Sequence, residues 1–196
     1  MKAASALRDA MKDGRVVRVY RQSLEPDGYS VEGFVVGVEE DLVLMHVIDP
    51  AIVLDGFRVL RIADITSVDS SFESGPFLER ALRLRRQRPR RPEGLRLDSV
   101  RAVIETAALI FPLITLHRER EHKDSCWIGR LVEVDDLRVT IDYITPAAEW
   151  DGQERYALRV LTKIDFGGRY EEALASVAGL APRPARRRST RPLQRM

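Results

Sequence analysis

Apolar residues recur at helical spacing at the start of the chain and then fall into short runs typical of β-strands. Ala3, Leu7, Ala10 and Met11 share one helical face, and Gly14 follows where glycine commonly ends a helix. Runs rich in β-branched and aromatic residues predict five strands, at residues 15–22, 31–39, 42–48, 58–62 and 65–69. Asp55-Gly56 predicts a turn before the fourth strand, and a closing helix is predicted at about residues 76–86.

The same pattern returns in the second half of the chain. A shift of 96 residues places Gly33–Asp69 on Gly129–Asp165 without a gap, and eleven of these 37 residue pairs are identical. The second copy begins with a helix that Asp98 or Ser99 can cap, and it ends with a helix at about residues 170–178. The gapless alignment predicts a duplicated module whose two copies superpose with this constant offset.

One helix followed by five short strands resembles the Sm-like fold, a relative of SH3-type barrels. The resemblance is one of pattern and covers residues 2–69 and 98–165. Three stretches, 33–38, 54–57 and 65–68, also resemble uncharacterised bacterial proteins. The resemblance implies a mainly β fold with short helices (α+β): two tandem five-stranded Sm-like barrels, each with an N-terminal and a trailing helix. The predicted organisation is a first Sm-like module (1–79), an Arg-rich helix end and linker (80–97), a second Sm-like module (98–181) and a basic, disordered tail (182–196).

The residues by which Sm-family proteins bind uridine are not present here. That family typically has Asp-x-Asn between strands two and three and Arg-Gly between strands four and five. The first copy has Glu39-Glu40-Asp41 and Ala63-Asp64 in those places, and the second has Asp135-Asp136 and Arg159-Val160. The resemblance to the Sm family therefore does not imply that these modules bind uridine.

Charge is distributed unevenly, although the formal net charge is only +2. Residues 1–79 carry −6 and residues 97–181 carry −5, whereas residues 80–96 carry +7 and residues 182–196 carry +6. Basic segments of this kind commonly contact nucleic acid, but they can also neutralise acidic parts of the same chain or of a partner. Both interpretations stay open for these arginines: Arg83, Arg85, Arg86, Arg88, Arg90, Arg91, Arg186, Arg187 and Arg188.

Catalytic motifs are lacking, so the sequence favours a non-enzymatic interaction or scaffold protein, with RNA or DNA binding as the alternative. His117, His122 and Cys126 have the spacing H-x4-H-x3-C, but they straddle a predicted hairpin turn, and we predict no metal site and no cofactor. The repeated acids Asp55/Asp151 and Asp69/Asp165 are interpreted as turn and capping residues.

Partners and location follow from general features of the sequence. Small open barrels have strand edges that pair readily, so self-association is expected, within the chain or between chains. A single cysteine and the lack of an apolar run long enough to span a membrane indicate a reduced, cytoplasmic protein that does not enter membranes.

Overall fold

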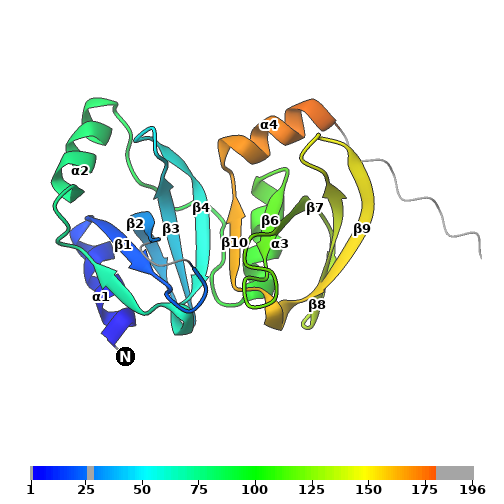
Figure 1. Ribbon diagram of the computed structural model, residues 1–196, viewed down its shortest axis with the longest axis horizontal. Coiled ribbons are helices and arrows are strands. Elements are labelled where there is room, and N and C mark those ends of the chain that lie inside the picture. Colours follow the sequence, from blue (N-terminus) through cyan, green and yellow to red (C-terminus); the bar gives the residue numbers. More distant parts are fainter. Residues whose placement is uncertain (1, 26–28, 180–196) are drawn as a thin grey trace, which may run out of the picture.

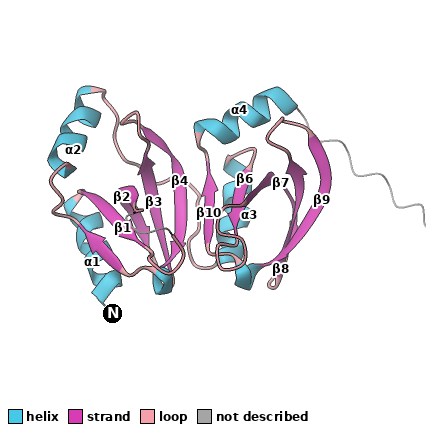
Figure 2. Cartoon of the chain, viewed as in Figure 1, coloured by secondary structure: helices cyan, strands magenta, loops and turns pink. Residues whose placement is uncertain are grey.

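The computed structural model describes residues 2–25 and 29–179. Within them the chain is α+β, with a ten-stranded antiparallel sheet and four α-helices (Figures 1 and 2). The first half contains α1 (Lys2–Asp13), β1 (Val16–Tyr20), β2 (Val31–Val38), β3 (Leu42–Ile48), β4 (Leu54–Arg61), the 3₁₀ helix η1 (Ile62–Asp64), β5 (Ser67–Asp69) and α2 (Gly75–Leu84). The second half contains α3 (Val100–Ile110), β6 (Ile114–His117), β7 (Cys126–Val134), β8 (Arg138–Ile144), β9 (Trp150–Ala157), the 3₁₀ helix η2 (Leu158–Val160), β10 (Lys163–Phe166) and α4 (Arg169–Ala178).

The two halves have the same order of strands, as expected for a repeated module. The strand order is β5-β1-β2-β3-β4 in the first half and β10-β6-β7-β8-β9 in the second. The offset of 96 residues carries β3 onto β8, β4 onto β9 and η1 onto η2 with identical bounds. Even the irregularity between Val35 and Gly37 in β2 recurs between Leu131 and Glu133 in β7.

Two tandem five-stranded barrels, the finer expectation, are not what the structure shows. β4 pairs with β10, with Arg58 opposite Asp165 and Phe57 opposite Phe166, so the two halves share one open sheet. We call this β4·β10 join the seam. It lies at the middle of the molecule in Figure 1, and the free edges of the sheet are β5 and β9.

The predicted turn at Asp55-Gly56 is also wrong, because β4 runs through both residues. The chain reverses earlier, where the backbone N–H of Asp49 donates to the carbonyl of Val53 (3.0 Å) and the Asp49 carboxylate accepts from the Val53 N–H (3.2 Å). Gly56 has a φ of +70°, a conformation that favours glycine. The strand therefore has an Asp-Gly pair here, which is also the pair typical of turns.

The helices cover the sheet in a way that follows their apolar faces. Leu7 and Ala10 of α1 pack against valines of β1, β2 and β3, while α2 packs through Leu78 and Leu82 on Val16. In the second half, Leu174 of α4 closes a small cluster. Helix α3 starts as predicted at Ser99, whose side-chain oxygen accepts from the Ala102 N–H (3.1 Å).

The largest core spans the seam. Buried side chains of α3 and β10 pack there with Leu42, Leu44, Phe57 and Val59 of the first half. The segment between α2 and α3 contributes too, since Leu95 and Leu97 are 4% and 2% exposed. Strand β3 is thus buried on both faces, as its sequence predicts, with Val43 and Met45 facing the α1 cluster instead.

Candidate functional site

The turn that follows α2 is fixed to the β3–β4 loop. The Arg85 guanidinium donates to the carbonyl oxygens of Ala51 (2.6 Å) and Ile52 (2.8 Å). The Gln87 side-chain oxygen accepts from the Leu54 N–H at 2.6 Å. Between these anchors Arg86 adopts a left-handed backbone with φ +57°, a conformation that costs a non-glycine residue about 1 kcal/mol or more. Arg85 and Gln87 therefore hold the turn in place.

Residues of this turn and of the last part of α2 line a hollow. Its volume is about 680 Å³, within the range of small-ligand sites. Arg83, Arg86 and Arg88 line it together with the apolar side chains of Leu82 and Phe34. The remaining lining residues are Gly14, Glu79, Gln87 and Pro89. Oε1 of Glu79 also accepts a hydrogen bond from the Val16 N–H (3.1 Å).

The three arginines of this arginine hollow are exposed, and none of them forms an ion pair with another residue that the structure describes. Ion pairs of the described residues involve other arginines, such as Arg96 with Asp98 and Arg58 with Asp165, and none involves Arg83, Arg86 or Arg88. Among residues 2–25 and 29–179, no carboxylate pairs with these three arginines, so the described ion pairs give no support to neutralisation within the chain at these positions. The hollow is suited to an anion that can accept hydrogen bonds from more than one guanidinium.

The other predicted arginines are used differently. Arg91 donates to the carbonyl of Leu95 (2.9 Å), and Arg85 is an anchor as described. The backbone N–H of Arg90 donates to Nδ1 of His46 (3.2 Å). Burial, followed by the charge of Arg90, lowers the pKa of His46 to about 4. Arg186, Arg187 and Arg188 lie outside the described residues.

His117, His122 and Cys126 do not converge. Nε2 of His117 lies 3.2 Å from Oδ2 of Asp165, and His122 meets the edge of Trp127. Cys126 lies opposite His117 in the β6·β7 pair, and burial raises the pKa of its thiol. Across residues 2–25 and 29–179, no three His, Cys, Asp or Glu side chains form a group that could hold a metal ion.

A buried ionic network at the seam is the feature that the sequence interpretation missed. Arg58 binds Asp165 through two hydrogen bonds of 2.8 Å each. Burial opposes ionisation of Asp165, but Arg58 and His117 hold its pKa well below the usual range. Asp165 is therefore not the turn cap that we expected, although its counterpart Asp69 does accept from the Ser71 N–H (2.9 Å).

A second part of the network surrounds Glu119. Both of its oxygens accept from Arg21 at 2.8 Å, and Lys163 binds it at 2.9 Å. Arg21 itself is fully buried and also pairs with Glu25. Since Arg21 comes from the first half and Glu119 from the second, the network fixes how the halves join. The signal in the sequence was the failure of the repeat at these positions, where Arg58 aligns with Glu154 and Arg21 with His117.

No family model matches the chain, and no curated protein matches it in sequence. Among the described helices none has the length and hydropathy needed to cross a membrane.

Proposed function

We propose that the chain is a non-enzymatic interaction protein built from two Sm-like modules joined edge to edge. The repeated strand order and the repeated bulges support the modules. The fused sheet supports a rigid scaffold, because the largest core and the ionic network both cross the seam.

Nucleic acid is the partner that we propose for this scaffold. The observation that carries the proposal is the arginine hollow, where Arg83, Arg86 and Arg88 outnumber the single carboxylate, Glu79, and form no ion pair with another described residue. Contacts between arginine and phosphate release counterions and so favour binding at low salt. The hollow has no aromatic side chain exposed for base stacking, since Phe34 is only 6% exposed. Binding is therefore expected to depend little on base sequence.

Self-association remains a proposal as well. The exposed apolar side chains of Tyr170 and Val177 on α4, 56% and 76% exposed, provide a surface for it. We place self-association on such surfaces and not on the outer strand edges, for the reasons given in the next subsection.

The experiment that tests nucleic-acid binding compares two charge-matched variants of the full chain. One carries Arg83→Ser, Arg86→Ser and Arg88→Ser, and the other carries Arg8→Ser, Arg138→Ser and Arg159→Ser, three exposed arginines outside the hollow. Binding of a short DNA duplex is titrated at several salt concentrations. We expect the hollow variant to lose at least about tenfold in affinity and to reduce the salt slope by about 2–3, while the control variant stays near the parent.

Two results would contradict this proposal. Equal binding by both variants would show that the hollow is not the contact surface, and removal of residues 182–196 then tests whether the tail arginines carry the affinity. A parent chain that binds no nucleic acid at low salt would exclude this partner class altogether.

A further inference from the structure

The two outer edges of the sheet are the repeat counterparts of the two strands that meet at the seam. β9 corresponds to β4, and β5 corresponds to the start of β10. If a second copy of the chain joined end to end in the seam register, β9 of one copy would pair with β5 of the next. The seam therefore serves as a template for judging whether the outer edges fit each other.

The central charge pair of the seam becomes a like-charge pair at the outer edges. In the seam Arg58 lies directly opposite Asp165. The same register at the outer edges places Glu154 opposite Asp69. Directly opposed residues of an antiparallel pair have neighbouring side chains, so opposite charges stabilise the pair and like charges destabilise it. The two charges at this register position therefore attract each other at the seam, whereas at the outer edges they would repel each other.

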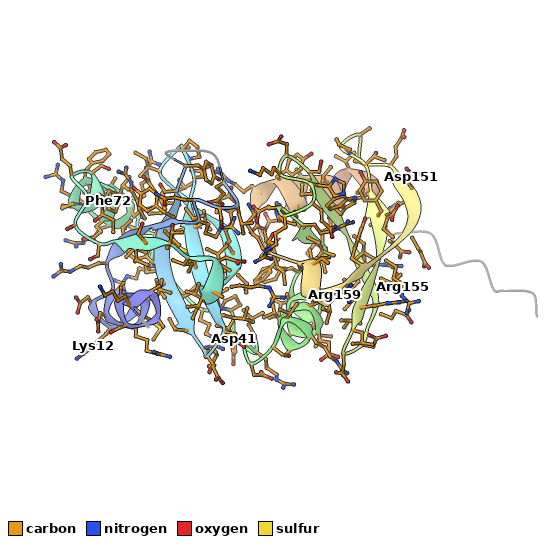
Figure 3. All side chains as sticks on the ribbon, turned by 60° about the horizontal axis from the view of Figure 1, so that its bottom comes forward. Lys12, Asp41, Phe72, Asp151, Arg155 and Arg159 are labelled. Atoms are coloured by element: carbon orange, nitrogen blue, oxygen red, sulfur yellow. The ribbon has the colours of Figure 1, made fainter. Side chains whose placement is uncertain are left out.

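The apolar contact of the seam is lost in the same way. Phe57 and Phe166 stack with ring centroids 5.9 Å apart. Their counterparts at the outer edges are Gln153 and Ser70, both exposed. Residues 151–155 of β9 are exposed and, apart from Gly152, carry polar side chains, and Figure 3 shows Asp151 and Arg155 at the margin of the molecule.

We propose that Glu154 and Asp69 form a charge gate that prevents copies of this chain from joining end to end. A strand edge presents unpaired N–H and C=O groups and invites pairing unless something opposes it. At β9 the opposing element is Glu154, which disfavours pairing with a strand that has an acidic residue at the facing position. The β9 edge fits instead an extended segment that places Arg or Lys opposite Glu154, and the β5 strand of a second copy, in the seam register, does not provide one.

The gate is tested by rebuilding the seam at the outer edges of the full-length chain. Gln153→Phe and Ser70→Phe restore the apolar contact at two exposed positions. In this double-Phe background three chains are compared, one that keeps Glu154, one with Glu154→Gln and one with Glu154→Arg. Association is measured by sedimentation equilibrium over a range of concentrations. We expect the association constant to be highest for the chain with Arg at position 154, lower for the chain with Gln and lowest for the chain that keeps Glu. The highest and lowest values should differ about tenfold.

A fourth chain checks that Asp69 is the facing residue. Adding Asp69→Asn to the Glu154→Arg chain is expected to return association to the level of the Glu154→Gln chain. The single variant Glu154→Arg, without the phenylalanines, is expected to associate in the same direction but more weakly. Equal association of the double-Phe chains with and without Glu154→Arg, or no association by any of them, would overturn the proposal. So would end-to-end oligomers of the unaltered chain.

Discussion

Strands β4 and β9 have the same length, the same place in the repeat and the same connection to a following 3₁₀ helix, yet one is interior and the other is an edge. Phe57 and Val59 of β4 are buried, whereas their counterparts Gln153 and Arg155 are exposed. The backbone of the module is therefore compatible with either environment, and the side chains of this strand decide which one it has.

The neighbouring strands show the same division. Leu42 and Leu44 of β3 are buried in the core that spans the seam, and the repeat aligns them with Arg138 and Thr140 of β8. By contrast, Val43 and Met45, which face the helix of their own module, align with Val139 and Ile141. Side chains that build a module are retained in kind, and side chains that join modules differ between the copies.

The largest expected effect comes from breaking the charge pair of the seam. Arg58→Ala leaves the carboxylate of Asp165, which is 16% exposed, without its main partner. Loss of one member of a buried ion pair costs about 3–5 kcal/mol. The matched control is Glu154→Ala at the repeat counterpart, where we expect a change within about 0.5 kcal/mol because the residue is exposed. Urea unfolding of both variants measures the difference, and equal losses would show that the comparison is wrong.

The second-largest effect is expected from low pH, which should destabilise the seam. Burial opposes ionisation of Glu119, but Arg21 and Lys163 lower its pKa from 4.5 to about 2. Because the folded pKa lies below the unfolded one, this stabilisation is complete above about pH 4.5 and is lost as the pH falls towards 2. It amounts to about 3 kcal/mol in full.

The measurement is the free energy of unfolding at a series of pH values. Glu119→Gln should remove this share of the acid slope, whereas Glu40→Gln, the same change at an exposed turn residue, should leave the slope intact. Identical slopes for the two variants would mean that Glu119 does not stabilise the seam as an ionised group.

A smaller effect is expected from two glycines that the repeat makes equivalent. Gly56 and Gly152 both have positive φ, of +70° and +78°, so alanine costs each of them about 1–2 kcal/mol of backbone strain. At Gly56 the added Cβ would also lie 2.7 Å from the backbone nitrogen of Gly168 across the seam, while at Gly152 it meets nothing within 4 Å. Gly56→Ala should therefore be more destabilising by about 1–3 kcal/mol, as thermal unfolding can determine. Similar losses at both sites would argue against this close approach.

The sequence predicted the repeated elements well because their signals are local. Helix spacing, the Ser99 cap and the apolar run at 42–48 all depend on neighbouring residues. It did not predict that β4 and β10 pair, since Arg58 and Asp165 are 107 residues apart and only the fold brings them together. The arginine segment was recognised, but the division into anchors such as Arg85 and lining residues such as Arg83 depends on which carbonyls lie nearby.

Native-state hydrogen exchange on the intact chain tests most directly the claim that β4 is an interior strand and β9 a free edge. Alternate amides of β4 bond to β10, and we predict that they exchange only on global unfolding. Their counterparts in β9, 96 residues later, have no strand to bond to and should exchange orders of magnitude faster. Slow exchange at these β9 amides would mean that another strand covers the edge, and fast exchange at β4 would mean that the seam does not form; either result would contradict the account.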